Sequence, residues 1–249
     1  MTRPALVTLH GLGLSARSFA PMLEHVRTPF DVVGIDLPGF GEARDERWTT
    51  VDALRGALVD RIAQEVGERD WMLVGHSVGG RLATLVAASL RDASGRMPRA
   101  MALLAPSPPT REPMPAAKRA EMLGWARSGR IDAEAARAFV DANVGAPLDE
   151  ALDRATVAGV AASDPASWIA WLESGSREDW SEEAGVVDVP LVVVAGEADD
   201  ALGAAAQPGL HGATYPRARW CALPGTGHLV ALERPAETAA AIDERWRDA

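Results

Sequence analysis

A serine lies between two glycines directly after a short apolar run, in the order Gly75-His76-Ser77-Val78-Gly79. Residues 71–74 are suited to a buried strand, and residues 81–90 are expected to form a helix. A serine at such a strand-to-helix turn presents its hydroxyl away from the sheet, next to the positive end of the helix. Because a serine hydroxyl attacks only after a base takes its proton, the pattern predicts a nucleophile if a base is close.

A base and an acid follow later in the chain, each after another apolar run. His228 ends the turn Gly225-Thr226-Gly227-His228, and two adjacent carboxylates, Asp199 and Asp200, follow Gly196. Histidine is the candidate base, and one carboxylate would fix its tautomer and stabilise the imidazolium that forms. Either aspartate could serve by residue type alone. The order of serine, acid and histidine along the chain is that of the α/β-hydrolase arrangement.

Six apolar runs with intervening helical segments must position these groups. Near-continuous apolar strands that alternate with helices indicate a mainly parallel sheet covered on both faces, whose carboxyl edge collects the turns. The expected strands are residues 5–9, 31–37, 71–74, 100–104, 189–195 and 219–223.

The interval 107–187 breaks this rhythm, since it opens with prolines and contains no convincing buried strand. It is expected to form a helical cap inserted in a core made of residues 1–106 and 188–249. The expected cap helices are residues 116–128, 132–143, 148–162 and 165–174.

Composition excludes several classes of function. A formal net charge of −10 argues against nucleic acid as a partner, because phosphate binding needs a basic surface. The one cysteine, Cys221, allows no internal disulfide, and no spacing of histidines and acids suggests a metal or cofactor site. No apolar run approaches the length of a membrane span, and no secretory signal is visible. We therefore expect a cytoplasmic enzyme that acts on a small molecule.

Several motifs together resemble the α/β-hydrolase superfamily: LHGLG, DLPGFG, GHSVGG, GEADD and GHLVALERP, which span nearly the whole chain. The resemblance implies a triad of Ser77, Asp199 and His228, with Asp199 at the usual position of the acid. It also implies an oxyanion hole made by the backbone N–H groups of Leu12 and Val78, so that the Leu12 side chain would line the substrate pocket. Asp200 is then interpreted as a helix cap or a solvated carboxylate.

The resemblance leaves three functions open. A serine at the elbow sets aside the dehalogenase and epoxide-hydrolase branches, and the DLPGFG turn is shared with pimeloyl-carrier-protein methyl esterases. The leading hypothesis is a serine hydrolase that cleaves carboxylic esters of small or medium acyl groups through an acyl-enzyme. The first alternative is the menaquinone-pathway lyase that eliminates pyruvate, and the second is a non-catalytic binding protein of the same fold.

Substrate contacts are expected at three residues in or near the cap. Arg81 occupies the position of an arginine that, in the lyase family, helps to hold an anionic substrate. Its side chain, one helical turn beyond Ser77, could reach the pocket or point into solvent. Trp168 and Trp171 are candidates for the wall of an apolar pocket.

Overall fold

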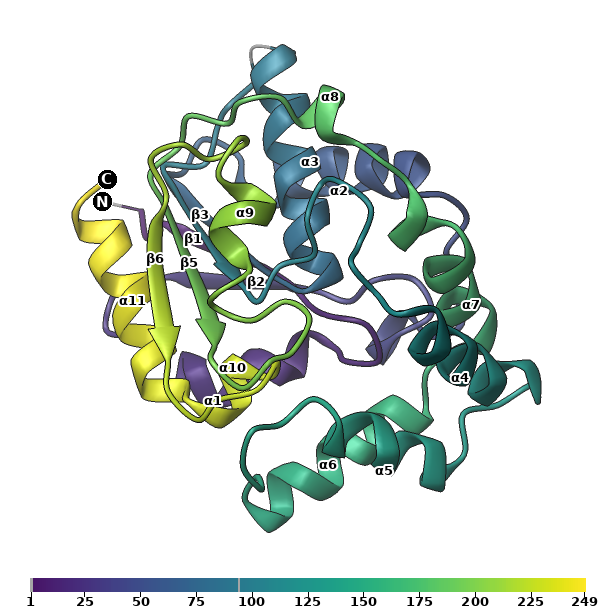
Figure 1. The fold of residues 1–249 in the computed structure, drawn as a ribbon. Coiled ribbons are helices and arrows are strands. Elements are labelled where there is room, and N and C mark those ends of the chain that lie inside the picture. The colour runs from purple at the N-terminus through teal and green to yellow at the C-terminus, as the bar shows by residue number, and fades with distance from the viewer. Residues whose placement is uncertain (1, 94) are drawn as a thin grey trace.

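The computed structural model describes residues 2–93 and 95–249 and contains one parallel sheet of six strands in the order β2-β1-β3-β4-β5-β6 (Figure 1). Helices lie on both of its faces, which confirms the expected α/β architecture. Three strands have the expected bounds, and the other three differ by one or two residues at one or both ends. The strands are β1 (Ala5–Leu9), β2 (Asp31–Ile35), β3 (Trp71–His76), β4 (Ala100–Leu104), β5 (Leu191–Gly196) and β6 (Arg219–Leu223).

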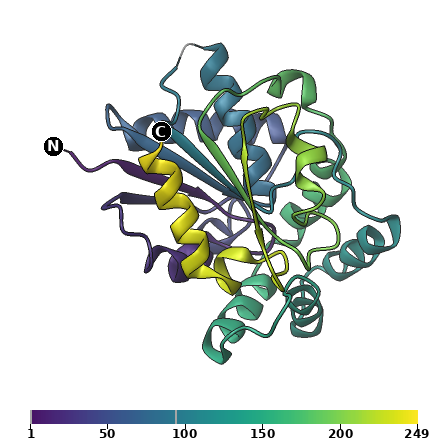
Figure 2. The same cartoon turned by 60° about the vertical axis from the view of Figure 1, so that its left-hand side comes forward.

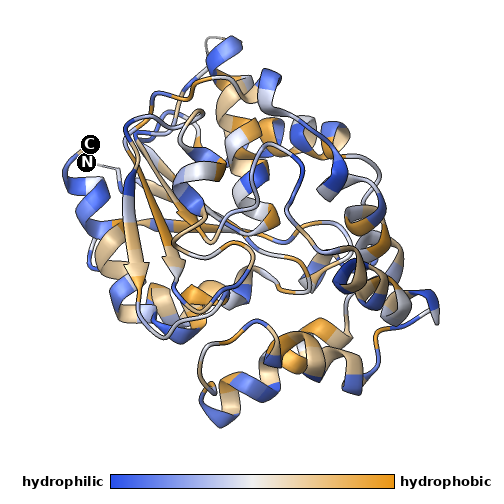
Figure 3. Cartoon of the chain, in the orientation of Figure 1, coloured by the Kyte–Doolittle hydropathy of each residue, from blue (hydrophilic) through white to orange (hydrophobic). Residues whose placement is uncertain are grey.

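Alternate residues of each strand point to opposite faces of the sheet. A different set of helices covers each face. Val7, Leu73 and Val193 pack in the cluster that includes α2 (Val51–Val66) and α3 (Val78–Asp92). Their strand neighbours pack on the other side, against α1 (Ala20–Leu23), α10 (Val230–Glu233) and α11 (Pro235–Arg247). Figure 2 shows α11 lying across the sheet, and Figure 3 shows hydrophobic residues along the strands and hydrophilic ones on the outer turns of α11. The four central strands β1, β3, β4 and β5 are therefore buried on both faces, whereas the edge strands β2 and β6 are partly exposed.

Residues 107–187 lie between β4 and β5 and are called the insertion below. Its long helices are α4 (Ala116–Arg127), α5 (Ala133–Asp141), α6 (Glu150–Ala161) and α7 (Pro165–Glu173). An aspartate caps each of the last three, since Asp132, Asp149 and Asp164 accept a hydrogen bond from a first-turn N–H group. In Figure 1 these helices lie together at the lower right, beside the sheet.

Short elements complete the chain. They are η1 (Ala16–Phe19), η2 (Gly41–Ala43), η3 (Gly175–Arg177), α8 (Ser181–Ala184) and α9 (Gln207–His211). Every helix in the part of the chain that the structure describes is too short or too polar to traverse a lipid bilayer.

Candidate active site

Ser77 forms a strained turn between β3 and α3. Its backbone has φ 52° and ψ −120°, a conformation that a residue with a side chain adopts only when its surroundings enforce it. Its N–H donates to the Leu104 carbonyl at 3.0 Å, and its carbonyl accepts from Gly80 at 2.8 Å and Ser107 at 2.9 Å. The turn is thus fixed by the neighbouring strand β4 as well as by its own helix.

Two glycines allow the helix to approach the sheet closely enough for this turn. A Cβ atom on Gly79 would lie 2.2 Å from the Leu9 carbonyl oxygen, and one on Gly75 would lie 2.5 Å from the Gly79 carbonyl oxygen. Both distances are far below van der Waals contact. The two glycines of the G-x-S-x-G pattern are therefore required by packing at this elbow.

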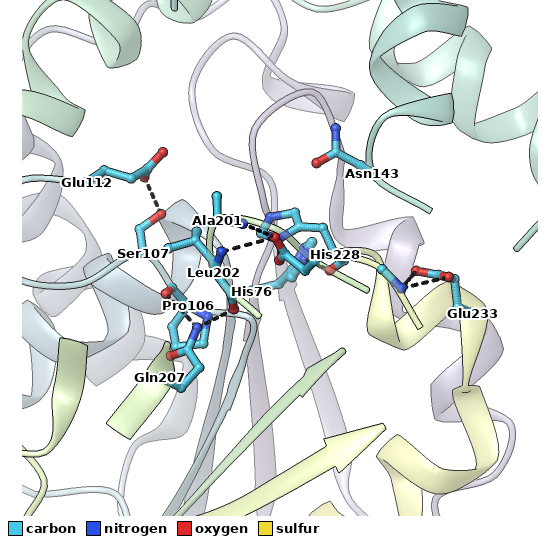
Figure 4. A network of polar contacts seen from close by, with 12 residues as sticks. His76, Pro106, Ser107, Glu112, Asn143, Ala201, Leu202, Gln207, His228 and Glu233 are labelled. Atoms are coloured by element: carbon cyan, nitrogen blue, oxygen red, sulfur yellow. Dashed lines mark hydrogen bonds and ion pairs between the residues drawn. The ribbon is translucent and has the colours of Figure 1, made fainter. Parts of the chain in front are cut away.

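Asp199 and His228 are hydrogen-bonded to each other at the carboxyl ends of β5 and β6. His228 Nδ1 lies 2.7 Å from Asp199 Oδ2, while Asp199 Oδ1 accepts from the N–H groups of Ala201 and Leu202 at 3.0 Å each (Figure 4). Burial alone would raise the pKa of this carboxyl, but His228 and the two N–H groups hold it well below its usual range. The ionised carboxylate fixes Nδ1 as the donor of this hydrogen bond. Asp200 is exposed.

The loop that carries His228 is held by a segment of the insertion. The backbone carbonyl of Asn143 accepts from the N–H groups of His228 at 2.8 Å and Leu229 at 3.2 Å. The Glu233 carboxylate accepts from Gly227 N–H, with both oxygens at 3.0 Å, and from Gly145 N–H at 2.7 Å. In Figure 4, Asn143 lies above His228 and Glu233 lies to its right. Sequence reasoning missed both residues, although Glu233 lies in the GHLVALERP motif.

Two further histidines are buried and neutral near the site. His76 Nε2 donates to the His228 carbonyl at 2.9 Å, its ring centroid lies 5.0 Å from that of His228, and burial lowers its pKa to about 3. His10 donates from Nδ1 to the Gly11 carbonyl at 2.8 Å and accepts from Leu37 N–H at Nε2, 2.9 Å away. Both His10 nitrogens are thus occupied, and burial lowers its pKa to about 4, which suits a structural role.

One cavity brings these groups together at the carboxyl edge of the sheet. Its volume is about 60 Å³, and both the strand-end turns and the insertion contribute to its wall. The turns contribute Gly11, Leu12, Ser77, Asp199 and His228, and the insertion contributes Glu112, Lys118, Met122, Phe139, Asn143 and Trp171.

Of the two amides expected to form an oxyanion hole, that of Leu12 belongs to a residue that lines this cavity and that of Val78 follows Ser77 directly. Val78 is the first residue of α3, so its N–H has no acceptor within the helix. The N–H of Leu12 donates to no protein acceptor within the described residues.

Arg81 lies outside the cavity, and its donors are used by the backbone. Nε donates to the Pro108 carbonyl and Nη2 to the Thr110 carbonyl, each at 2.6 Å, while Nη1 donates to Gly175. The guanidinium carbon lies 5.0 Å from the ring centroid of Trp171. Burial lowers the pKa of Arg81 to about 10, so the group stays charged at neutral pH. This placement does not support the expected substrate contact, and instead Arg81 ties α3 to both ends of the insertion.

The two tryptophans expected at the substrate differ in position. Trp171 is buried and contributes to the cavity wall. Trp168 does not reach the cavity: its Nε1 donates to the Met122 carbonyl at 3.1 Å, and its ring meets Phe139 edge-on with centroids 5.1 Å apart. Trp168 therefore supports the wall from behind.

Glu112 and Lys118 are charged groups of the cavity that sequence reasoning missed. Ser107 Oγ donates to Glu112 Oε2 at 2.6 Å, directly beside the elbow (Figure 4). No motif marks either residue, because their positions depend on how the insertion folds back. Among residues 2–93 and 95–249, no group of histidines, cysteines and acids is arranged to hold a metal ion.

The chain matches a known protein family. The sequence profile described as "Alpha/beta hydrolase family" matches residues 6–241, which is nearly the entire chain. The chain therefore belongs to the alpha/beta hydrolase family, as the motifs implied.

Individual curated relatives match only part of the chain. A pimeloyl-[acyl-carrier protein] methyl ester esterase from Xanthomonas oryzae pv. oryzae is 36% identical over 105 residues, which is 42% of this chain and 38% of that enzyme. The matched segments cover between 17% and 38% of the first curated relatives' length.

Solved structures share the fold over almost the whole chain. A thermophilic esterase from Thermogutta terrifontis superposes with a TM-score of 0.79 at 19% identity, over 99% of this chain and 90% of that one. MenH from S. aureus superposes with a TM-score of 0.72 at 21% identity, over 100% and 95% of the two chains. At these identities the likeness shows the fold alone.

Proposed function

We propose that this chain is a serine esterase that cleaves carboxylic esters of small or medium acyl groups through an acyl-enzyme. One observation carries the proposal: a serine in strained elbow geometry and a histidine bonded to a buried carboxylate line the same cavity. That combination activates a nucleophile and has little other structural purpose. The cavity volume of about 60 Å³ favours acyl groups of modest size.

In the acylation half, Ser77 Oγ attacks the ester carbonyl carbon as His228 Nε2 takes the hydroxyl proton. Asp199 stabilises the imidazolium that results, and the N–H groups of Leu12 and Val78 donate to the oxyanion. The tetrahedral intermediate then expels the alcohol, which receives the proton from His228. Ser77 is left as an acyl ester.

Deacylation repeats these steps with water as the nucleophile. His228 Nε2 takes a proton from water, the hydroxide adds to the acyl carbon, and the same two amides hold the oxyanion. Collapse of the intermediate returns the proton to Ser77 Oγ and releases the carboxylic acid. We propose that the insertion acts as a cap during this cycle, because it closes the cavity opposite the strand ends.

The lyase alternative has weaker support than the esterase. It rests on an arginine at the elbow that binds an anionic substrate, and the donors of Arg81 are occupied by three carbonyls. Incubation with the pyruvate-eliminating substrate, followed by pyruvate release, tests it directly. A cytoplasmic location and the absence of nucleic-acid partners remain expectations from the sequence.

An active-site-directed fluorophosphonate probe and a series of p-nitrophenyl esters test the esterase proposal. We expect single-site labelling at Ser77 and turnover that falls as the acyl chain exceeds the cavity. Ser77→Ala should abolish labelling and lower turnover by about a million-fold, or to background, because the triad acts as a unit. Absence of labelling would instead support the non-catalytic binding protein, and residual turnover within tenfold would exclude Ser77 as nucleophile.

A further inference from the structure

Lys118 is the single lysine in the sequence of 249 residues, and it lines the cavity that holds Ser77 and His228. All other basic side chains, apart from the histidines, are arginines. Lys118 is half-buried, and within residues 2–93 and 95–249 its ammonium group takes part in none of the ion pairs or hydrogen bonds found. A cation in the wall of a cavity without a protein partner is available to a ligand.

The other charged groups of the cavity are already engaged. Asp199 is bonded to His228 and to two amides, and Glu112 accepts from the buried Ser107 hydroxyl. The backbone of Glu112 is also fixed, since its N–H donates to the Ser176 carbonyl at 2.9 Å. Lys118 is therefore the one charged group of the described cavity wall with no bond to another protein group.

Helix stability does not explain this lysine. Lys118 is the third residue of α4, and a cation in the first turn faces the positive end of the helix dipole. The first turn of α4 also contains no acidic residue that could offset it. The interaction of the Lys118 ammonium group with the helix dipole is therefore unfavourable. An anion bound next to that group in the cavity would offset it.

The surface next to the cavity also carries positively charged residues. An adjoining groove shares Glu112 and Met114 with the cavity, and three of the four charged residues that line it are Arg111, Arg119 and Arg177. In a chain with a net charge of −10, this local excess of cations favours the approach of an anionic substrate to this face.

We propose that Lys118 makes this cavity selective for esters whose acyl group carries a second, ionised carboxylate, that is, for monoesters of dicarboxylic acids. The inference rests on the proposed esterase function, with Ser77 attacking the ester carbonyl while Lys118 binds the distal carboxylate. A charge-assisted hydrogen bond in a partly desolvated site supplies the selectivity. Neutral esters of the same length lack this contact.

Matched methyl esters test the proposal through a ratio of rates. We would measure kcat/KM for monomethyl adipate and for methyl hexanoate, which have acyl chains of equal length, by following methanol release. The wild type should favour the adipate monoester by roughly tenfold to a hundredfold. Monomethyl succinate and monomethyl suberate then report which chain length matches the distance from Ser77 to Lys118.

Variants at two positions of α4 test whether Lys118 causes the preference for the adipate monoester. Lys118→Met should bring the ratio close to one and Lys118→Glu should invert it, whereas Lys118→Arg should retain it. Arg127→Met is the matched control, because Arg127 lies on the same helix, pairs with Glu173 and does not line the cavity. A wild-type ratio near one, or a ratio that Lys118→Met leaves unchanged, would overturn the proposal.

A binding measurement separates this inference from the proposed function. Calorimetric titration of Ser77→Ala with monomethyl adipate and methyl hexanoate requires no turnover, so it remains informative if Ser77 is not labelled and no ester is cleaved. Monomethyl adipate should bind at least tenfold more tightly than methyl hexanoate, and addition of Lys118→Met should remove the difference. Equal affinities would exclude a carboxylate contact at Lys118, even in an enzyme that hydrolyses neutral esters rapidly.

Discussion

The strand-end turns and the helical insertion line one cavity, but they hold their side chains in different ways. Ser77, Asp199 and His228 follow directly from strands of a single sheet, so the sheet geometry determines where they meet. Residues of the insertion reach the cavity from helices that pack on the core through buried apolar side chains and are also bonded to it through Arg81. The candidate triad thus lies on turns that follow the strands, whereas much of the remaining cavity wall comes from helices of the insertion.

After that of Ser77→Ala, the largest expected effect tests whether the turn geometry selects one of two adjacent acids. Asp199→Asn should lower kcat by about ten-thousand-fold, the loss measured for the corresponding aspartate in another triad. Asp200→Asn is the matched control, because Asp200 is the next residue and is exposed. Steady-state hydrolysis of p-nitrophenyl butyrate by both variants checks this. A greater loss from Asp200→Asn would mean that the acid is wrongly assigned.

The same contrast explains what could be predicted from the sequence. The sheet and the turns after its strands were predictable because near-continuous apolar runs and glycine-rich turns are local signals. The helices of the insertion were also predictable from local sequence, with bounds correct to within a few residues at each end.

What could not be predicted depends on contacts between distant segments. Arg81 was expected at the substrate, and its true partners, the carbonyls of Pro108, Thr110 and Gly175, lie 27 to 94 residues away. Carbonyl groups have no sequence signature, so no motif indicates that they will meet a given arginine. Lys118 reaches the cavity for a similar reason, since only the tertiary position of α4 brings it there.

The second prediction concerns the free energy of unfolding at mildly acidic pH. Its decrease should come from buried histidines of the core and not from the insertion. Every histidine lies outside residues 107–187, and burial lowers the pKa of His10 and His211 to about 4 and that of His76 to about 3. In the unfolded chain these groups take up protons below pH 6.5, whereas the folded protein binds them only near pH 4 or below. Stability is therefore constant with respect to these histidines above pH 6.5 and falls as the pH decreases.

Urea unfolding at pH 7, 6 and 5 measures this effect. Three protons taken up only on unfolding give a slope of roughly 4 kcal/mol per pH unit near pH 5. His211→Gln should reduce that slope by about a third, because it removes one of the three groups while leaving an amide that can donate to the Pro106 carbonyl. A free energy of unfolding that is constant from pH 7 to 5 would contradict the prediction.

The third prediction concerns the attachment of the insertion to the core. Arg81→Met keeps the length of the side chain but leaves three carbonyls without their donor, so we expect a loss of about 3 kcal/mol in the free energy of unfolding. Arg61→Met on the exposed face of α2 is the matched control. Chemical denaturation followed by tryptophan fluorescence compares the two. Equal stabilities would show that Arg81 does not fasten the insertion.

The smallest expected effect lies where the two regions meet, at Glu233. Its carboxylate accepts from Gly227 on the histidine loop and from Gly145 on the insertion, so it couples the position of His228 to that of the insertion. Glu233→Gln replaces one acceptor oxygen by a donor that opposes an N–H group, and we expect kcat to fall roughly tenfold, equivalent to about 1.4 kcal/mol. KM should stay nearly constant, because Glu233 does not line the cavity.

The split between kcat and KM separates this positioning role from a purely structural one. The rate of fluorophosphonate labelling of Ser77 should fall in parallel with kcat, since both reactions need His228 in place, while the unfolding free energy changes little. Glu237→Gln, at an exposed position in the first turn of α11, should alter none of these quantities. If Glu233→Gln instead raised KM and left kcat and labelling intact, the histidine loop would hold its position without the insertion, and the two regions would be independent.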